Sequence, residues 1–194
     1  MHVDNWFQRN LTVFNFLQTT IPDDSKFKRA MLCPEHGKAL IRLSTRLSYM
    51  DRREEALEAV QEAAELYRQL AKDDPTAFNP DLAISLDILS NHLSNLGHRE
   101  DALDAIREAV ELHRLLAKDC PSTFNPNFAT SLDHLSSHLS DLGHREDALE
   151  AVQEAVQLYR QLAKDHPATF NHDFAISQQS LQSSVRSVPS RRCS

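Results

Sequence analysis

The sequence predicts an all-α protein built as an α-solenoid of antiparallel helix pairs. Three observations lead to this fold class: a long internal repeat, apolar residues spaced three and four apart within each repeat, and a scarcity of glycine. One helix pair buries too little apolar surface to fold alone, so neighbouring pairs must stack. With only 3 glycines in 194 residues, the turn-rich chains of β-sandwiches and barrels are disfavoured.

The repeat is clearest around two of the glycines. Residues 97–103, Gly-His-Arg-Glu-Asp-Ala-Leu, recur unchanged as residues 143–149, an offset of 46 residues. The same offset relates Pro75 to Pro121 and Pro167. We therefore expect a repeat domain over residues 31–186. Its units are predicted to span about 34–79, 80–125 and 126–171, with a partial fourth copy over 172–186.

Each unit is predicted to contain two helices. In the second unit Asn79 is a suitable N-cap and Pro80 suits the first helical position, while Gly97 can adopt the left-handed conformation that ends a helix. The buried stripe expected for this helix is Leu82, Leu86, Leu89, Leu93 and Leu96. The stripe expected for the following helix is Ala102, Leu103, Ile106, Ala109, Val110, Leu112, Leu115 and Leu116. Pro121 should prevent that second helix from continuing.

The order of small and large residues resembles the tetratricopeptide repeat (TPR) family. The residues that carry the resemblance in the second unit are Leu86, Leu89, Ser90, Leu93, Gly97, Ala102, Ile106 and Ala109. The third unit matches equally well, whereas the first has Asp51 where the glycine belongs. The long repeat resembles the kinesin light chain type, as in fungal and bacterial signalling proteins. The resemblance implies a right-handed superhelix that binds other proteins.

By position within such a stack, the first helix of each pair should line a concave groove. The resemblance implies partner-binding residues in all three units: Ile41, Thr45, Tyr49, Asp87, Asn91, Ser94, Asn95, Asp133, Ser137, Ser140 and Asp141. Asn and Asp side chains can hold the backbone of an extended peptide, and carboxylates favour Lys or Arg. We expect a mildly acidic groove for a basic or neutral protein or peptide. The alternative is that these residues form an ordinary solvated helix face.

Both ends of the chain depart from the repeat. Residues 1–30 are predicted to hold a capping helix and a linker, with Phe7, Leu11, Phe14 and Leu17 at helical spacing. Residues 187–194 are rich in Ser and Arg and are predicted to be disordered. Because no proper cap follows the decaying fourth copy, the chain is expected to belong to a longer array or to associate with itself through that end.

Catalysis and cofactor binding are not expected. Three scattered glycines cannot form a loop that cradles phosphate. A metal-dependent enzyme is the least favoured reading: His134 and His138 are four residues apart with Asp141 nearby, but the His-Glu-x-x-His arrangement is absent. We therefore predict no catalytic, cofactor or metal residues. The other alternative is a regulatory solenoid segment of a larger signalling protein that has no partner of its own.

Charge and cysteine content limit the partners and the location. A formal net charge of -7 disfavours nucleic acid and anionic lipid as partners, and no apolar run is long enough to cross a bilayer. Cys33, Cys120 and Cys193 are odd in number and far apart, so neither a disulfide framework nor a zinc site is indicated. A reducing, cytoplasmic location fits this pattern.

Overall fold

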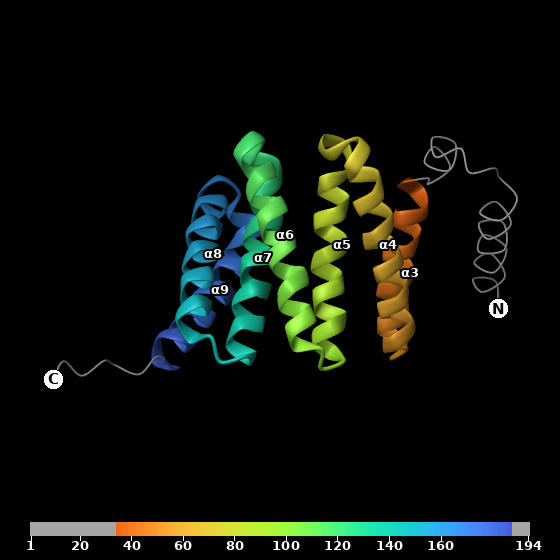
Figure 1. Cartoon of the computed structure of the whole chain (residues 1–194). Helices are drawn as coiled ribbons and strands as arrows, with labels where there is room; N and C mark the ends of the chain where they lie inside the picture. Colours follow the sequence, from red (N-terminus) through yellow and green to blue (C-terminus); the bar gives the residue numbers. More distant parts are fainter. Residues whose placement is uncertain (1–33, 188–194) are drawn as a thin grey trace, which may run out of the picture.

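The computed structural model describes residues 34–187, and all regular structure within that range is helical. Seven helices follow one another along this part of the chain: α3 (Pro34–Tyr49), α4 (Arg53–Asp73), α5 (Pro75–Asn95), α6 (Arg99–Asp119), α7 (Pro121–Asp141), α8 (Arg145–Asp165) and α9 (Pro167–Ser187). Each helix packs against the next, so the helices lie side by side in chain order (Figure 1). The predicted right-handed α-solenoid of antiparallel helix pairs is confirmed.

We number the units by their helix pairs. The first unit is α3–α4, the second is α5–α6, the third is α7–α8, and α9 is the first helix of a fourth. The predicted capping helix over residues 1–30, with Phe7, Leu11, Phe14 and Leu17, lies outside the described residues, as does nearly all of the predicted tail at 187–194.

The start of α5 was predicted wrongly. Helix α5 begins at Pro75, and the Asp74 side chain accepts a hydrogen bond of 3.0 Å from the Ala77 amide as its N-cap. Pro80, the expected start, lies inside the helix. Asp74-Pro75 and Asn79-Pro80 are both good start signals, and the chain uses the earlier one. A tetratricopeptide repeat usually has a period of about 34 residues, and the additional residues of this longer repeat extend its helices instead of forming a loop.

The connections inside the units follow the prediction. Gly97 and Gly143 have φ values of 85° and 83°, the left-handed conformation that only glycine adopts without strain. The amide of His98 bonds the Leu93 carbonyl at 2.9 Å, which closes the end of α5. In the first unit Asp51 occupies the glycine position and has a φ of 59°. Asp is among the few other residues that tolerate this region.

The core consists of the predicted leucine and alanine stripes, with one exchange on the second helices. Ala102, Ile106 and Ala109 are fully buried, as expected. Leu115, expected inside, is 55% exposed, and His113 is buried in its place at 1%. The helical period explains the exchange, because position 113 continues the stripe of 102, 106 and 109, and position 115 lies on the other side of the helix.

The first and last described helices have more exposed apolar side chains than the middle of the stack. On α9, Ile176 and Val185 are 47% and 53% exposed, whereas Leu139, the residue of α7 that corresponds to Val185, is 3% exposed. No second helix packs on this side of α9 within residues 34–187. The predicted self-association through this end stays a prediction.

Candidate functional site

The predicted groove residues all lie on the first helices, but their environments differ. Six are exposed: Thr45, Tyr49, Asn95, Ser137, Ser140 and Asp141. Five are half-buried: Ile41, Asp87, Asn91, Ser94 and Asp133. Ile41 packs against the hydrophobic core. The exposed set is therefore the most accessible part of the predicted groove.

Asp87 connects three helices. Its carboxylate on α5 accepts a hydrogen bond from the Ser131 hydroxyl of α7, and its Oδ1 lies 3.1 Å from Nδ1 of His134 on the same helix as Ser131. His113 Nε2 on α6 lies 3.5 Å from Oδ2, within ion-pair distance but beyond a well-formed hydrogen bond. With a side chain only 14% exposed, Asp87 joins the second unit to the third.

Burial alone would raise the pKa of Asp87. Contacts with His113, His134 and Ser131 outweigh burial, and the pKa falls below the usual range of an aspartate. The carboxylate is therefore ionised at neutral pH and engaged inside the protein.

Asp133 occupies the same position one unit later and behaves differently. Its Oδ1 accepts a hydrogen bond of 2.9 Å from the Ser177 hydroxyl of α9. No histidine faces it from the second helix of its own unit, because Tyr159 stands where His113 stands in the second unit. Burial raises the pKa of Asp133, and the hydrogen bond from Ser177 only partly offsets that rise.

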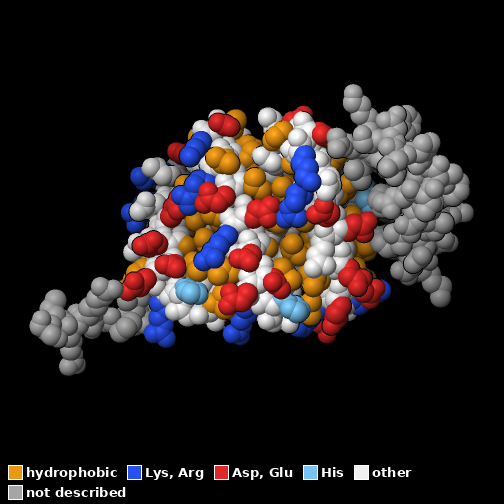
Figure 2. All heavy atoms as spheres, in the orientation of Figure 1, with side chains coloured by type: hydrophobic (Ala, Val, Ile, Leu, Met, Phe, Trp, Pro, Cys, Tyr) orange, Lys and Arg blue, Asp and Glu red, His pale blue; other side chains and the backbone are white. Residues whose placement is uncertain are grey.

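The second helices are joined by a different and recurrent contact. Arg68 of α4 bonds Glu108 of α6 at 2.9 Å, and Arg114 of α6 bonds Glu154 of α8 at 3.1 Å. Arg114 also lies over the Phe128 ring, 5.2 Å from its centre. These ion pairs are partly exposed and each contributes little stability, about 0–1 kcal/mol. In Figure 2, charged groups of both signs are interspersed over the face shown.

The histidine pair considered for a metal does not converge. His134 contacts Asp87, whereas His138 is 6% exposed and has its Nε2 3.4 Å from the Ser90 hydroxyl. Asp141 is exposed. Burial lowers the pKa of His138. Within the described part of the chain, no group of three His, Cys, Asp or Glu side chains is arranged to hold a metal ion.

Comparison with known proteins identifies the repeat. A family model described as tetratricopeptide repeat matches residues 38–77 and 128–168, which cover most of the first and third units and the first residues of α5 and α9. The repeats of this chain are therefore tetratricopeptide repeats. The model of anaphase-promoting complex subunit 5 matches residues 81–121. No curated protein sequence matches the chain. Tetratricopeptide repeats generally serve as protein-interaction scaffolds.

Solved structures agree on the fold. A point variant of a Podosopora anserina putative kinesin light chain with nearly identical TPR-like repeats has 18% identity. The match has a TM-score of 0.57 and covers 79% of this chain and 71% of that one. A second crystal structure of that putative kinesin light chain has 16% identity and a TM-score of 0.56, with 82% and 80% covered. Aspartyl phosphate phosphatase F from Bacillus subtilis has 14% identity and a TM-score of 0.55. That match covers 79% of this chain but only 42% of the phosphatase.

None of the described helices is both long and apolar enough to cross a membrane.

Proposed function

We propose that this tetratricopeptide-repeat chain is a scaffold or adaptor that binds a protein or peptide along the face formed by its first helices. The main support is the exposure of three equivalent positions, Tyr49, Asn95 and Asp141, at the ends of α3, α5 and α7. Helices α5 and α7 also contact each other directly. Such contact draws the first helices together and favours a concave surface on their side of the stack.

The exposed side chains suit a basic or neutral segment. Asn95 can both donate and accept hydrogen bonds, and the Asp141 carboxylate can accept them from a Lys or Arg side chain. The formal net charge of -7 would accelerate the approach of a cationic partner. Asp87 and Asp133 contribute indirectly, because their carboxylates are engaged by neighbouring helices.

As part of this proposal, the protein is located in the cytoplasm and has no catalytic role. Cys120, the one cysteine among the described residues, is an exposed free thiol. A reducing compartment keeps such a thiol unpaired.

The experiment that tests this function screens the full chain against immobilised peptides that differ in charge. We expect basic and neutral peptides to be retained over acidic ones. The Asp141→Lys variant should weaken the best basic peptides about tenfold, which corresponds to about 1.4 kcal/mol.

Glu150→Lys on the second helix α8 is the matched control, because Glu150 is exposed and the charge changes by the same amount. It should leave binding nearly unchanged. Equal losses in the two variants would show that only overall charge matters, and retention of no peptide class would contradict the proposed function.

A further inference from the structure

The first helix of the stack has an exposed patch that the other first helices lack. Arg42, Arg46, Tyr49 and Met50 are all exposed and are spaced so that they share one side of α3 and of the turn that follows it. Tyr49 is 88% exposed and Met50 is 67% exposed, more than any other exposed large hydrophobic side chain among the described residues. We call these four residues the α3 patch.

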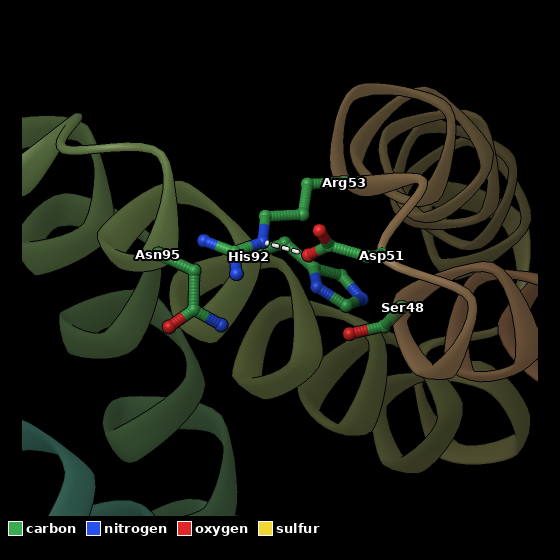
Figure 3. A pocket seen from close by; sticks show the side chains of 5 residues that line it. All are labelled: Ser48, Asp51, Arg53, His92 and Asn95. Carbon is green, nitrogen blue, oxygen red and sulfur yellow. Dashed lines mark hydrogen bonds and ion pairs between the residues drawn. The ribbon is translucent and has the colours of Figure 1, made fainter.

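Neither arginine of the α3 patch has a carboxylate partner among residues 34–187. The nearby Arg53 is engaged, because its Nε donates a hydrogen bond of 2.7 Å to Asp51 Oδ1 (Figure 3). Arg42 and Arg46 are four residues apart, and like charges at this spacing slightly destabilise a helix. The patch therefore holds two guanidinium groups that the fold itself does not use.

In later units, the repeat position of Arg46 is an interface position. Arg46 corresponds to His92 one repeat later and to His138 two repeats later. His92 is buried beside the α3–α4 connection, which belongs to the preceding unit (Figure 3). His138 is also buried, and its Nε2 lies 3.4 Å from the Ser90 hydroxyl of α5. A preceding element therefore covers this position in both later units.

The repeat position of Arg42 is also an interface position in the third unit, and there it faces a carboxylate. Arg42 corresponds to His134, whose Nδ1 lies 3.1 Å from Oδ1 of Asp87 on α5. Helices α5 and α7 contact each other directly, so a neighbouring helix presents Asp87 and Ser90, three residues apart, to these two positions of α7. On α3 the same two positions carry guanidinium groups, which favour carboxylates as partners.

Tyr49 and Met50 add apolar surface to the same patch. The residues that correspond to Met50 are Leu96 and Leu142, which are half-buried. A flexible thioether beside an exposed aromatic ring offers an adaptable surface for an apolar side chain. An occupant that matches the whole patch therefore combines carboxylates with at least one apolar side chain.

We propose that the α3 patch binds an acidic amphipathic helix of a protein partner, which lies beside α3 as α5 lies beside α7. Its carboxylates pair with Arg42 and Arg46, and an apolar side chain packs on Tyr49 and Met50. The inference goes beyond the proposed function, which assigns a basic or neutral segment to the first-helix face around Asp141. An anionic membrane fits less well, because surface binding usually takes clusters of about four to eight cations and the chain has a formal net charge of -7.

The test is an NMR titration of the full chain, labelled at the methionine methyl groups, with a blocked peptide of two copies of Glu-Ala-Ala-Leu-Glu-Ala-Ala. Met50 reports directly on the patch, and a Met50→Leu variant assigns its signal. We expect a saturable shift of the Met50 methyl signal, with a Kd on the order of 1 mM. The same peptide with glutamine in place of glutamate keeps the shape without the charge and should bind at least tenfold more weakly.

A second control peptide tests whether the partner must be helical. A proline in the middle of the glutamate peptide keeps its charge but breaks the helix, and it should also weaken binding at least tenfold. Acidic peptides that do not form a helix should therefore bind poorly, which separates this patch from the preference for basic and neutral segments on the first-helix face.

The decisive variant combines Arg42→Gln with Arg46→Gln. Glutamine is a good helix former and the change removes a like-charge pair, so this variant should stay folded and lose the Met50 shift. Arg107→Gln removes an exposed arginine from α6 and should leave the shift intact. Arg42→Glu combined with Arg46→Glu should prefer the same peptide with lysine in place of glutamate.

Equal binding of the glutamate and glutamine peptides, undiminished binding of the proline peptide, or a Met50 shift that survives the double glutamine variant would each overturn the proposal. Vesicles that contain phosphatidylserine form the remaining arm. If they bind through the two arginines and the glutamate peptide does not, the patch serves a lipid surface and the proposal is wrong.

The proposed function fails separately from this inference. A Met50 shift with the glutamate peptide, without retention of any immobilised basic or neutral peptide, would contradict the proposed function only. Retention of basic peptides that depends on Asp141, without a Met50 shift, would contradict the acidic-helix site only.

Discussion

Two interfaces of the stack have an aspartate at the same repeat position, but the pKa of that aspartate is shifted in opposite directions. Between the second and third units Asp87 meets His113, His134 and Ser131, and its pKa is lowered. Between the third unit and α9, Asp133 accepts a hydrogen bond from Ser177, and its pKa is raised. The backbone and the register are alike, so the difference comes from the neighbouring side chains. His113 and His134 lie near Asp87, whereas the negative charge of Asp173 lies near Asp133. A buried carboxylate is stabilised or destabilised in its charged form by its immediate partners.

The largest expected effect is a difference in stability between two matched substitutions. Asp87→Asn removes a charge that the folded protein favours and should lower the free energy of unfolding at pH 7 by about 1–3 kcal/mol. Asp133→Asn removes a charge that burial disfavours, and its amide oxygen can still accept from Ser177. We expect that change to stay within about 1 kcal/mol, with either sign. Urea denaturation of both variants measures the difference, and equal losses would contradict it.

The pH dependence of the two variants should differ in sign. Asp87 has a lowered pKa when folded, so it stabilises the fold above the unfolded value of about 3.9 and this contribution is lost as pH falls through the folded pKa. Asp133 has a raised pKa in the folded protein, so above that pKa its charged form lowers the free energy of unfolding. This destabilisation is lost as the pH falls through the folded pKa.

Denaturation of the parent and both variants between about pH 7 and pH 3 tests these signs. The deficit of Asp87→Asn relative to the parent should shrink toward the acidic end. A deficit that grows at the acidic end of this range, below about pH 4, would show that the folded protein does not favour the Asp87 carboxylate.

Replacing the two serines by alanine should lower the stability by smaller amounts, and here the larger loss is expected at the Asp133 interface. Ser177→Ala leaves the Asp133 carboxylate without its hydrogen-bond donor and should cost about 1 kcal/mol. Ser131→Ala leaves Asp87 with His134 and His113 and should cost less, about 0.5 kcal/mol. Thermal or urea denaturation of the two alanine variants gives the comparison, and a larger loss for Ser131→Ala would break it.

Most of the fold could be predicted from the sequence because the repeat constrains it. The offset between Gly97 and Gly143 and the leucine spacing define helix pairs without any three-dimensional knowledge. The error at Leu115 was avoidable, since the corresponding residues of the other units are Gln69 and Gln161, which mark an outward position. The late start assigned to α5 was less avoidable, because two Pro-containing start signals lie five residues apart.

The candidate site was harder to predict. The role of Asp87 depends on Ser131 and His134, which lie 44 and 47 residues away, and only the packing of α5 against α7 brings them together. An amphipathic pattern identifies a polar face but cannot tell a free carboxylate from one that a neighbouring helix engages. The pairing of Asp87 with Ser131 recurs as Asp133 with Ser177, so comparison between units was the one available signal.

The most direct measurement is an NMR titration of the side-chain carboxyl carbons of Asp87 and Asp133 in the folded chain. The two interfaces predict that Asp87 titrates below and Asp133 above the ordinary aspartate value of about 3.9. Coincident titration curves, or the reverse order, would show that the histidines do not distinguish the two interfaces.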